Sequence, residues 1–326
     1  MVRYKKKPNI YRSYTMDRFP TAEERWPRKG IVTEMQIDKL ESLIDRNAKR
    51  KRPMYDQEMR TFLKTIDYSW NYPIDHYVKN FTDWLMGHKT NKLLGLDAFP
   101  DRRIILGVTQ AINDLYMMYP NRIVILEGEY FYHDQLFPDI KIKTLETLKN
   151  GDILLISMPF CGENYGVHPR MPEILEKCLY ENIPVHIDAA WYPCSRGITF
   201  DLDHPAIQSV SCSLTKAYGI SEHRSGVRYS RTPMPGYVTW MTDNDSIPCK
   251  QNFWTGIKFM DKFGPDYWWS KYGDDYDYIL KHCKNLAPSP AIHVAFSTDD
   301  NGNIVKAVPM KEALLYVNTF DNGTTT

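Results

Sequence analysis

The middle of the chain alternates short apolar runs with amphipathic stretches. Five of these runs have the length and the β-branched content of buried strands. They span residues 122–127, 152–157, 184–188, 209–214 and 226–230. Between the runs, apolar residues recur at helical spacing over 109–119 and 171–182. Apolar strands that alternate with helices are typical of a mostly parallel sheet covered on both faces, so the pattern predicts an α/β fold.

The flanking regions are more polar and more aromatic than this central block. Residues 1–100 include helical spacing at 38–44 and 77–85, which predicts a helical and partly extended arm. Three further elements are expected in the C-terminal part. They are a helix near 272–285, a strand at 291–296 and a last helix at 310–317.

Composition narrows the classes of function. The 326 residues are 43% hydrophobic, and 41 basic residues balance 40 acidic ones, which gives no whole-chain electrostatic argument for binding nucleic acid or a membrane. The basic stretch 49–52 is interpreted as a solvated helix end. No apolar run approaches the ~20 residues that span a bilayer. The six cysteines are scattered without a CxxC pair, so no metal site is predicted and a reduced, cytoplasmic protein is expected.

Candidate chemistry follows the predicted strands. In an open α/β sheet, ligands bind outside the carboxyl ends of the strands. Asp188 ends one predicted strand, and Trp191 comes three residues later. Ser213 lies at the end of the next, with Lys216 three residues after it and Arg224 eight residues after the lysine. A carboxylate, an amine and a guanidinium group are therefore expected at one edge of the sheet.

This spacing resembles that of the pyridoxal 5′-phosphate (PLP) enzymes of fold type I, which are also called the aspartate aminotransferase superfamily. The resemblance is to the class I/II aminotransferase-like members of that superfamily. That family has an Asp at a strand end, an aromatic three residues later, and a Ser-x-x-Lys followed by Arg and Gly eight and ten residues past the lysine. The matching residues are Asp188, Trp191, Ser213, Lys216, Arg224 and Gly226. The match covers roughly residues 100–231.

The resemblance implies that Lys216 is the catalytic residue and holds PLP as a Schiff base. Burial and nearby cations can lower the pKa of a lysine enough for this chemistry. Asp188 is expected to keep the ring nitrogen protonated, which lets PLP act as an electron sink. The Arg224 guanidinium can clasp the phosphate with two hydrogen bonds, and Ser213 can add a hydroxyl donor.

Two earlier segments are expected to complete the cofactor site by the same resemblance. Gly107 lies where a strand enters a helix, and the family places its phosphate-binding turn there. Val108 and Thr109 are then expected to offer backbone N–H groups to the phosphate. Tyr130 follows the strand at 122–127 and is the predicted ring stacked on the pyridine, with Tyr132 as the alternative.

The chain departs from the family pattern around the pyridine oxygen. The family has an Asn-Pro-x-x-Gly loop whose asparagine donates to that oxygen. Here Met158 stands before Pro159, and Asn164 is shifted along the chain. Trp191 replaces the usual tyrosine and removes a hydroxyl donor. Control of this oxygen is therefore expected to differ.

A second departure concerns the substrate. The family binds the substrate α-carboxylate with an arginine of the C-terminal small domain, but no arginine follows Arg231 and only 110 residues follow Lys216. The C-terminal domain is therefore expected to be shortened. Either a lysine or N–H donors hold the carboxylate, or the substrate is not an ordinary α-amino acid. Available cations are Lys250, Lys258 and Lys262.

The resemblance also implies an organisation and a function. Residues 101–231 would form the PLP-binding core of the large domain. Residues 1–100 would form the N-terminal arm and the helical part of a small domain. Residues 232–326 would form the rest of the large domain and the shortened C-terminal part of the small domain. A homodimer with shared active sites is expected, in which Tyr72 (or Tyr68) reaches the partner's phosphate.

The expected activity is that of an aminotransferase acting on an amino acid or another primary amine. A PLP-dependent lyase or decarboxylase, or a non-catalytic binding protein with this fold, are the alternatives. A dinucleotide or P-loop site has little support, because neither GxGxxG nor GxxxxGK[ST] occurs.

Overall fold

The computed structural model describes residues 34–48, 54–68, 72–137, 139–162 and 164–319. The basic stretch 49–52 lies outside these residues. Within the described ranges, every helix is too short or too polar to cross a membrane.

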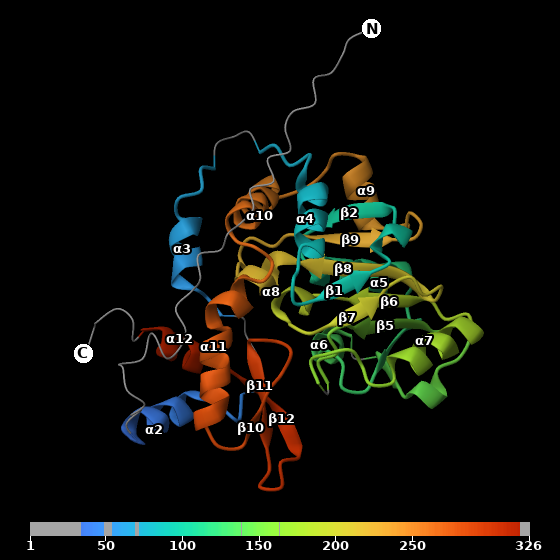
Figure 1. Ribbon diagram of the computed structural model, residues 1–326. Coiled ribbons are helices and arrows are strands. Elements are labelled where there is room, and N and C mark those ends of the chain that lie inside the picture. The colour runs from blue at the N-terminus through green and yellow to red at the C-terminus, as the bar shows by residue number, and fades with distance from the viewer. Residues whose placement is uncertain (1–33, 49–53, 69–71, 138, 163, 320–326) are drawn as a thin grey trace.

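The central sheet has seven strands in the described part of the chain, in the order β2-β9-β8-β6-β5-β3-β4 (Figure 1). β9 runs antiparallel to both of its neighbours, and the other adjacent strands are parallel. The strands are Asp101–Ile105 (β2), Ile123–Leu126 (β3), Lys141–Lys143 (β4), Ile153–Ser157 (β5), Val185–Asp188 (β6), Ile207–Ser213 (β8) and Gly226–Ser230 (β9). The predicted α/β fold with a mostly parallel sheet is confirmed, and all five predicted strands are present.

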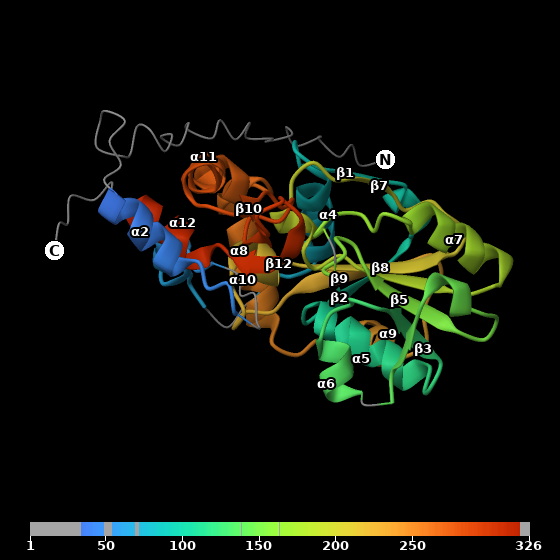
Figure 2. The same cartoon turned by 90° about the horizontal axis from the view of Figure 1, so that it is seen from below.

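The inner strands are apolar on both faces because each face is covered by helices. Alternate residues point to opposite sides of a strand. Val124 and Leu154 join the core that includes residues of α4 and α7, whereas Ile123 and Ile153 pack with residues of α5. Figure 2 shows α4 and α7 on one side of the sheet and α5 on the other. These helices span Tyr77–Met86 (α4), Val108–Met118 (α5) and Met171–Tyr180 (α7).

A second group of elements brings the two ends of the described chain together. Helix α2 (Glu34–Leu43) packs against α12 (Lys311–Thr319), which packs against α11 (Tyr267–His282). Beside them lies an antiparallel sheet of three strands in the order β10-β11-β12 (Figure 1). These strands are Leu286–Ala287 (β10), Val294–Thr298 (β11) and Ile304–Pro309 (β12).

Two predicted elements of this group are displaced along the chain. Helix α11 begins at Tyr267, five residues before the predicted start, and its first turns bury Trp268 and Trp269. Strand β11 begins at Val294 because Ala291 forms an isolated bridge with Ser195 and a turn follows.

The described residues form these further elements. They are α3 (Gln57–Leu63), β1 (Lys92–Leu94), α6 (Tyr132–Leu136), β7 (Thr199–Asp201), α8 (Leu214–Tyr218), α9 (Tyr237–Asp243) and α10 (Lys250–Lys262), with short 3-10 turns at Leu96–Ala98, Leu145–Thr147 and Tyr192–Cys194. β1 and β7 pair in parallel, and α10 packs against α4.

The register of the sheet places polar side chains at one edge. β5, β6 and β8 end at Ser157, Asp188 and Ser213, and Ser157 is the register partner of Asp188. Gly226 allows β9 to lie close against β8, since a Cβ added there would come within 2.2 Å of the Cys212 carbonyl oxygen. Strand ends and the start of α8 therefore meet at the carboxyl edge, where a ligand site is expected.

A candidate cofactor site at the carboxyl edge of the sheet

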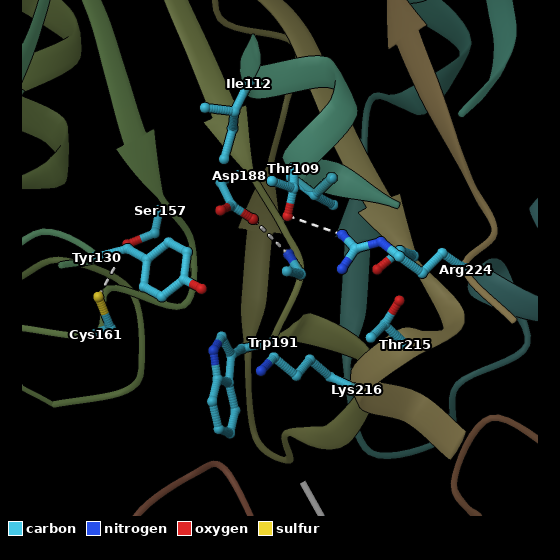
Figure 3. A pocket seen from close by; sticks show the side chains of 13 residues that line it. Thr109, Ile112, Tyr130, Ser157, Cys161, Asp188, Trp191, Thr215, Lys216 and Arg224 are labelled. Carbon is cyan, nitrogen blue, oxygen red and sulfur yellow. Dashed lines mark hydrogen bonds between the residues drawn. The ribbon is translucent and has the colours of Figure 1, made fainter. Parts of the chain in front are cut away.

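A pocket opens at this edge, with about 600 Å³ of space when the part open to solvent is counted. It is lined by Val108, Thr109, Ile112, Tyr130, Ser157, Cys161, Asp188, Ala190, Trp191, Ser213, Thr215, Lys216 and Arg224 (Figure 3). Eight of the nine predicted site residues lie here, and Tyr72 does not. The structure therefore brings the predicted residues together, while their roles stay predictions.

Lys216 lies on the short helix α8, directly after β8. Its Nζ is 5.0 Å from the centre of the Trp191 ring, and Figure 3 shows the side chain pointing toward that ring. Burial lowers the pKa of this amine, and the nearby Arg224 guanidinium lowers it further. A buried amine with a lowered pKa is more readily neutral, which is the form that attacks a carbonyl carbon.

Asp188 ends β6 and is only 8% exposed. Its Oδ1 accepts a hydrogen bond from the backbone N–H of Ala190 at 2.8 Å. Burial raises the pKa of Asp188 to about 6, although this hydrogen bond and the positive charge of Lys216 act in the opposite direction. The Ala190 hydrogen bond and the Lys216 charge offset only part of the cost of burying this carboxylate. Asp188 is therefore suited to bind a cationic group of a ligand.

Arg224 lies beside the N-terminus of α5. Its Nη2 donates to Thr109 Oγ1 at 2.8 Å, and its Nε donates to the Leu106 carbonyl oxygen at 3.1 Å. Gly107 makes room for this guanidinium, because a Cβ added there would lie 2.8 Å from Nη2. Gly107 also has φ of 78°, which favours glycine. A permanent cation and a helix N-terminus thus face the same part of the pocket, as an anion requires.

Two hydroxyl groups add donors to the lining of the pocket, beside this cation. Thr215 Oγ1 is buried, lines the pocket and has no hydrogen-bond partner in the described structure. Ser213 is the N-cap residue of α8, but its side chain makes no capping hydrogen bond. A buried hydroxyl without a partner is costly unless a ligand satisfies it. Together with Arg224, these groups fit a phosphate, so the residues present fit PLP.

Aromatic rings form other walls of the pocket. Tyr130 lines it, whereas Tyr132 stacks on Tyr130 at 5.7 Å and donates to Asn113 Oδ1, outside the lining. Burial and the charge of Asp188 raise the pKa of Tyr130. The Trp191 ring lies 5.0 Å from Lys216 Nζ. The structure thus places Tyr130, and not the alternative Tyr132, where a ligand ring could stack.

Other predicted candidates lie away from the pocket. The Tyr72 hydroxyl donates to the Tyr68 carbonyl oxygen, and Tyr68 stacks on His223. Asn164 hydrogen-bonds within its own turn, to Gly166 and Val167.

The three lysines considered as carboxylate ligands are also elsewhere. Lys250 pairs with Asp245, Lys258 lies over the ring of Trp254, and Lys262 is in the last turn of α10. The described residues contain no group of three or more His, Cys, Asp and Glu side chains suited to a metal ion.

Sequence reasoning missed Glu129, which connects two walls of the pocket. Its carboxylate accepts hydrogen bonds from the Ser157 N–H at 2.6 Å, the Ser157 hydroxyl at 2.9 Å and the Tyr130 N–H at 3.1 Å. Burial raises the pKa of Glu129 to about 7, and the neighbouring Asp188 carboxylate adds to the increase. Nothing in the spacing distinguishes Glu129 from Glu127, which is exposed on the same turn.

Replacing Glu129 with alanine is expected to weaken PLP binding by about tenfold, because Ser157 and the Tyr130 turn lose their common acceptor. The dissociation constant is measured by absorbance titration with PLP. Glu127→Ala removes an exposed carboxylate from the same turn and serves as the control. Equal dissociation constants for the two variants would contradict a positioning role of Glu129.

Comparisons with known proteins agree with this fold. No protein-family model and no curated protein sequence matches the chain. Among solved structures, an aminotransferase from Mycobacterium tuberculosis is similar with a TM-score of 0.55 and 13% identity, over 78% of this chain and 79% of that one. A tyrosine aminotransferase from Leishmania infantum gives a TM-score of 0.55 and 12% identity, over 83% and 90%. A PLP-bound protein of Clostridium difficile 630, described as a candidate aminotransferase, gives 0.51 and 13%, over 82% and 89%.

These similarities establish the class of fold. The chain has the architecture of the PLP-dependent aminotransferases of fold type I, which confirms the predicted fold class. At 12–13% identity the likeness concerns the fold alone.

Proposed function

We propose that this chain is a PLP-dependent enzyme, an aminotransferase that acts on an amino acid or another primary amine through Lys216. One observation carries the proposal. The pocket gathers a buried amine, a buried carboxylate and a guanidinium group at a helix N-terminus, from Lys216, Asp188 and Arg224. Each of these meets a different chemical demand of PLP, and the fold is shared with PLP-dependent aminotransferases.

The role of each residue in this proposal follows from its chemistry. Arg224, with the hydroxyl of Thr215 and the start of α5, binds the phosphate. Asp188 keeps a proton on the ring nitrogen, and Tyr130 covers one face of the ring. Bound PLP then supplies an electron-withdrawing ring that stabilises negative charge on the substrate. Lys216 would hold the cofactor covalently, and its Nζ would accept and return a proton at the substrate.

Covalent labelling tests this proposal. The protein is mixed with PLP, reduced with borohydride and digested, and the peptides are analysed by mass spectrometry. We expect one pyridoxyl group, attached to Lys216, and none on the Lys216→Ala variant. Lys258, another lysine that lies beside a tryptophan, serves as the internal control. Labelling at surface lysines alone would overturn the proposal.

The type of reaction is tested with an amino donor and a keto-acid acceptor. An aminotransferase exchanges the amino and keto groups of the two substrates. Release of ammonia, sulfide or carbon dioxide from the donor would instead favour the lyase or decarboxylase alternative. Binding of PLP without either outcome would favour the non-catalytic alternative.

Replacing Arg224 with glutamine is expected to weaken PLP binding by about 10- to 100-fold, because charge-assisted hydrogen bonds to a phosphate are lost. Binding of pyridoxal, which has no phosphate, is expected to change little. Both dissociation constants are measured by absorbance titration. Arg122→Gln, at an exposed arginine just before β3, is the matched control. An equal loss for pyridoxal and PLP would place Arg224 away from the phosphate.

We also propose a homodimer in which Tyr72 contributes to the partner's site. The proposal rests on the resemblance to the family and on the position of Tyr72 outside its own pocket. Light scattering coupled to size-exclusion chromatography tests the dimer. Mixing Tyr72→Phe and Lys216→Ala chains tests the shared site, since hybrid dimers would then regain an intact one.

A further inference from the structure

The helix that carries Lys216, α8, has only five residues and is held by side chains from the C-terminal part of the chain. Isolated helices of this length are not stable in water, and the last four carbonyl groups of a helix have no partner within it. In α8 these carbonyl groups include those of Lys216 and Ala217. His293 Nε2 lies 3.2 Å from the Lys216 carbonyl oxygen, and Trp268 Nε1 donates to that of Ala217. The His293 and Trp268 rings also pack edge-on, with centres 5.2 Å apart, so the two donors support each other.

The His293 ring is completely buried, and among the described residues its side chain makes this one hydrogen bond. A carbonyl oxygen can only accept, so Nε2 must carry the proton and donate it. Burial lowers the pKa of His293 to about 3, which keeps the ring neutral near pH 7 and leaves Nδ1 as an acceptor. Nδ1 has no hydrogen-bond partner in the described structure. A buried acceptor without a donor is costly, and the polar contact that His293 makes in return is the one to Lys216.

The segment that carries His293 is also attached to the turn that follows Trp191. The Ile292 N–H donates to the Cys194 carbonyl oxygen at 3.2 Å. The His293 ring packs edge-on against Trp191, with ring centres 5.9 Å apart. The centre of the same Trp191 ring lies 5.0 Å from Lys216 Nζ. His293 therefore contacts both the backbone of Lys216 and the ring beside its amine.

We propose that His293 is a positioning residue for Lys216, which fixes the direction of the amine through the Lys216 carbonyl group and the Trp191 ring. The inference rests on the function proposed for Lys216. An amine attacks a carbonyl carbon rapidly only when both are held in a reactive orientation, and a displacement of about 1 Å can slow a reaction about 100-fold. Asp188 and Arg224 are held by other groups, the Ala190 N–H and the start of α5. Loss of the His293 donor is therefore expected to slow covalent attachment of PLP and to leave non-covalent binding in place.

Two forms of the cofactor separate these effects. Pyridoxamine 5′-phosphate has no aldehyde, so its dissociation constant, from absorbance titration, reports on non-covalent binding alone. Saturating PLP, quenched with borohydride at successive times and followed by mass spectrometry, gives the rate of attachment to Lys216. For His293→Met we expect this rate to fall at least about tenfold, while the affinity for pyridoxamine 5′-phosphate changes less than about twofold. A wild-type rate would overturn the proposal, and so would equal losses of rate and affinity, because a general distortion of the pocket produces them.

Two further variants locate the effect. His293→Gln keeps a neutral N–H donor and is expected to restore most of the lost rate. His186→Met removes another buried histidine, on β6, whose ring bonds Ser209 and whose Nε2 has no partner in the described structure. Its rate of attachment is expected to match wild type. A glutamine variant as slow as His293→Met, or an equally slow His186→Met, would assign the effect to packing and contradict the proposal.

The protonation of the ring decides the matter if His293→Met does not fold. In wild-type protein labelled with ¹⁵N in its histidine side chains, nitrogen chemical shifts distinguish a ring protonated at Nε2 from one protonated at Nδ1. The His293 signal is identified by comparison with His293→Gln. We expect a neutral ring with its proton on Nε2 near pH 7. A proton on Nδ1 alone would overturn the proposal, because Nε2 could not then donate to the Lys216 carbonyl oxygen.

The same measurements separate this inference from the proposed function. If PLP does not attach to Lys216 in the wild-type protein, the proposed function is wrong and the inference is wrong with it. If PLP attaches to Lys216 and His293→Met reacts at the wild-type rate, the proposed function stands and the inference alone is wrong.

Discussion

Replacing Asp188 with asparagine is expected to make the cofactor-free protein more stable at neutral pH and its turnover about 10²- to 10³-fold slower. The slower turnover follows from the proposed role of Asp188, since a neutral amide cannot hold a proton on the ring nitrogen of PLP. The gain in stability follows from burial of the carboxylate. Asparagine keeps an oxygen that can accept the Ala190 N–H.

The direction of the pH dependence follows from the raised pKa. Burial raises the pKa of Asp188 from its ordinary value of 3.8 to about 6 in the folded protein. Between these two values the folded state holds a proton that the unfolded chain has lost, so the free energy of unfolding falls as the pH rises. The penalty is absent below about pH 4 and complete above about pH 6. The penalty is roughly 1–3 kcal/mol, because relaxation around the charged carboxylate recovers part of the cost of burying it.

Urea unfolding at two pH values checks this expectation. Asp188→Asn is expected to raise the midpoint relative to wild type at pH 7 and to match it at pH 4. Asp134→Asn, at an exposed position on α6, should show no such difference. A wild-type-like midpoint at pH 7, with turnover still lost, would show that the buried carboxylate imposes no cost on the folded state.

The sequence predicts the inner strands well because burial on both faces makes them apolar throughout. β5 and β6 are buried at every position, and their runs stand out from the flanking helices. The edge strands β4 and β12 have mostly exposed residues and contain lysines. Periodicity and composition therefore do not distinguish these two strands from loops, and neither strand was predicted.

The candidate site, like the sheet, has a part that the sequence predicts and a part that it does not. Asp188 and Ser213 end β6 and β8, which are neighbours in the sheet, and Trp191, Lys216 and Arg224 follow them closely, so their spacing along the chain carries the geometry. Glu129 and Ser157 meet because β3 and β5 are neighbours in the sheet, an order that no local pattern reveals. The contact between the Tyr165 and Phe296 rings, whose centres are 6.3 Å apart, joins segments more than 100 residues apart in the sequence. Such contacts follow from the tertiary fold, which the sequence pattern specified only as a class.

Replacing Arg228 with methionine is expected to destabilise the protein by about 3–5 kcal/mol, the largest effect on folding predicted for this chain. Arg228 on β9 is fully buried, and its Nη1 donates to Asp114 Oδ2 at 2.7 Å. Its Nη2 donates to Thr239 Oγ1, and Asp114 Oδ1 accepts the Tyr237 N–H. These hydrogen bonds thus link β9, α5 and α9. Methionine fills similar space but leaves the Asp114 carboxylate buried without its cation.

The double variant Arg228→Met with Asp114→Leu separates the loss of the ion pair from the loss of packing. Replacing both partners by apolar groups removes the uncompensated charge, so most of the lost stability is expected to return. Arg170→Met breaks an exposed pair with Glu146 and should cost less than about 1 kcal/mol. Urea midpoints at constant slope measure all three variants. If Arg228→Met and the double variant unfold at the same midpoint, the cost lies in packing around β9, and the buried charge of Asp114 does not determine it.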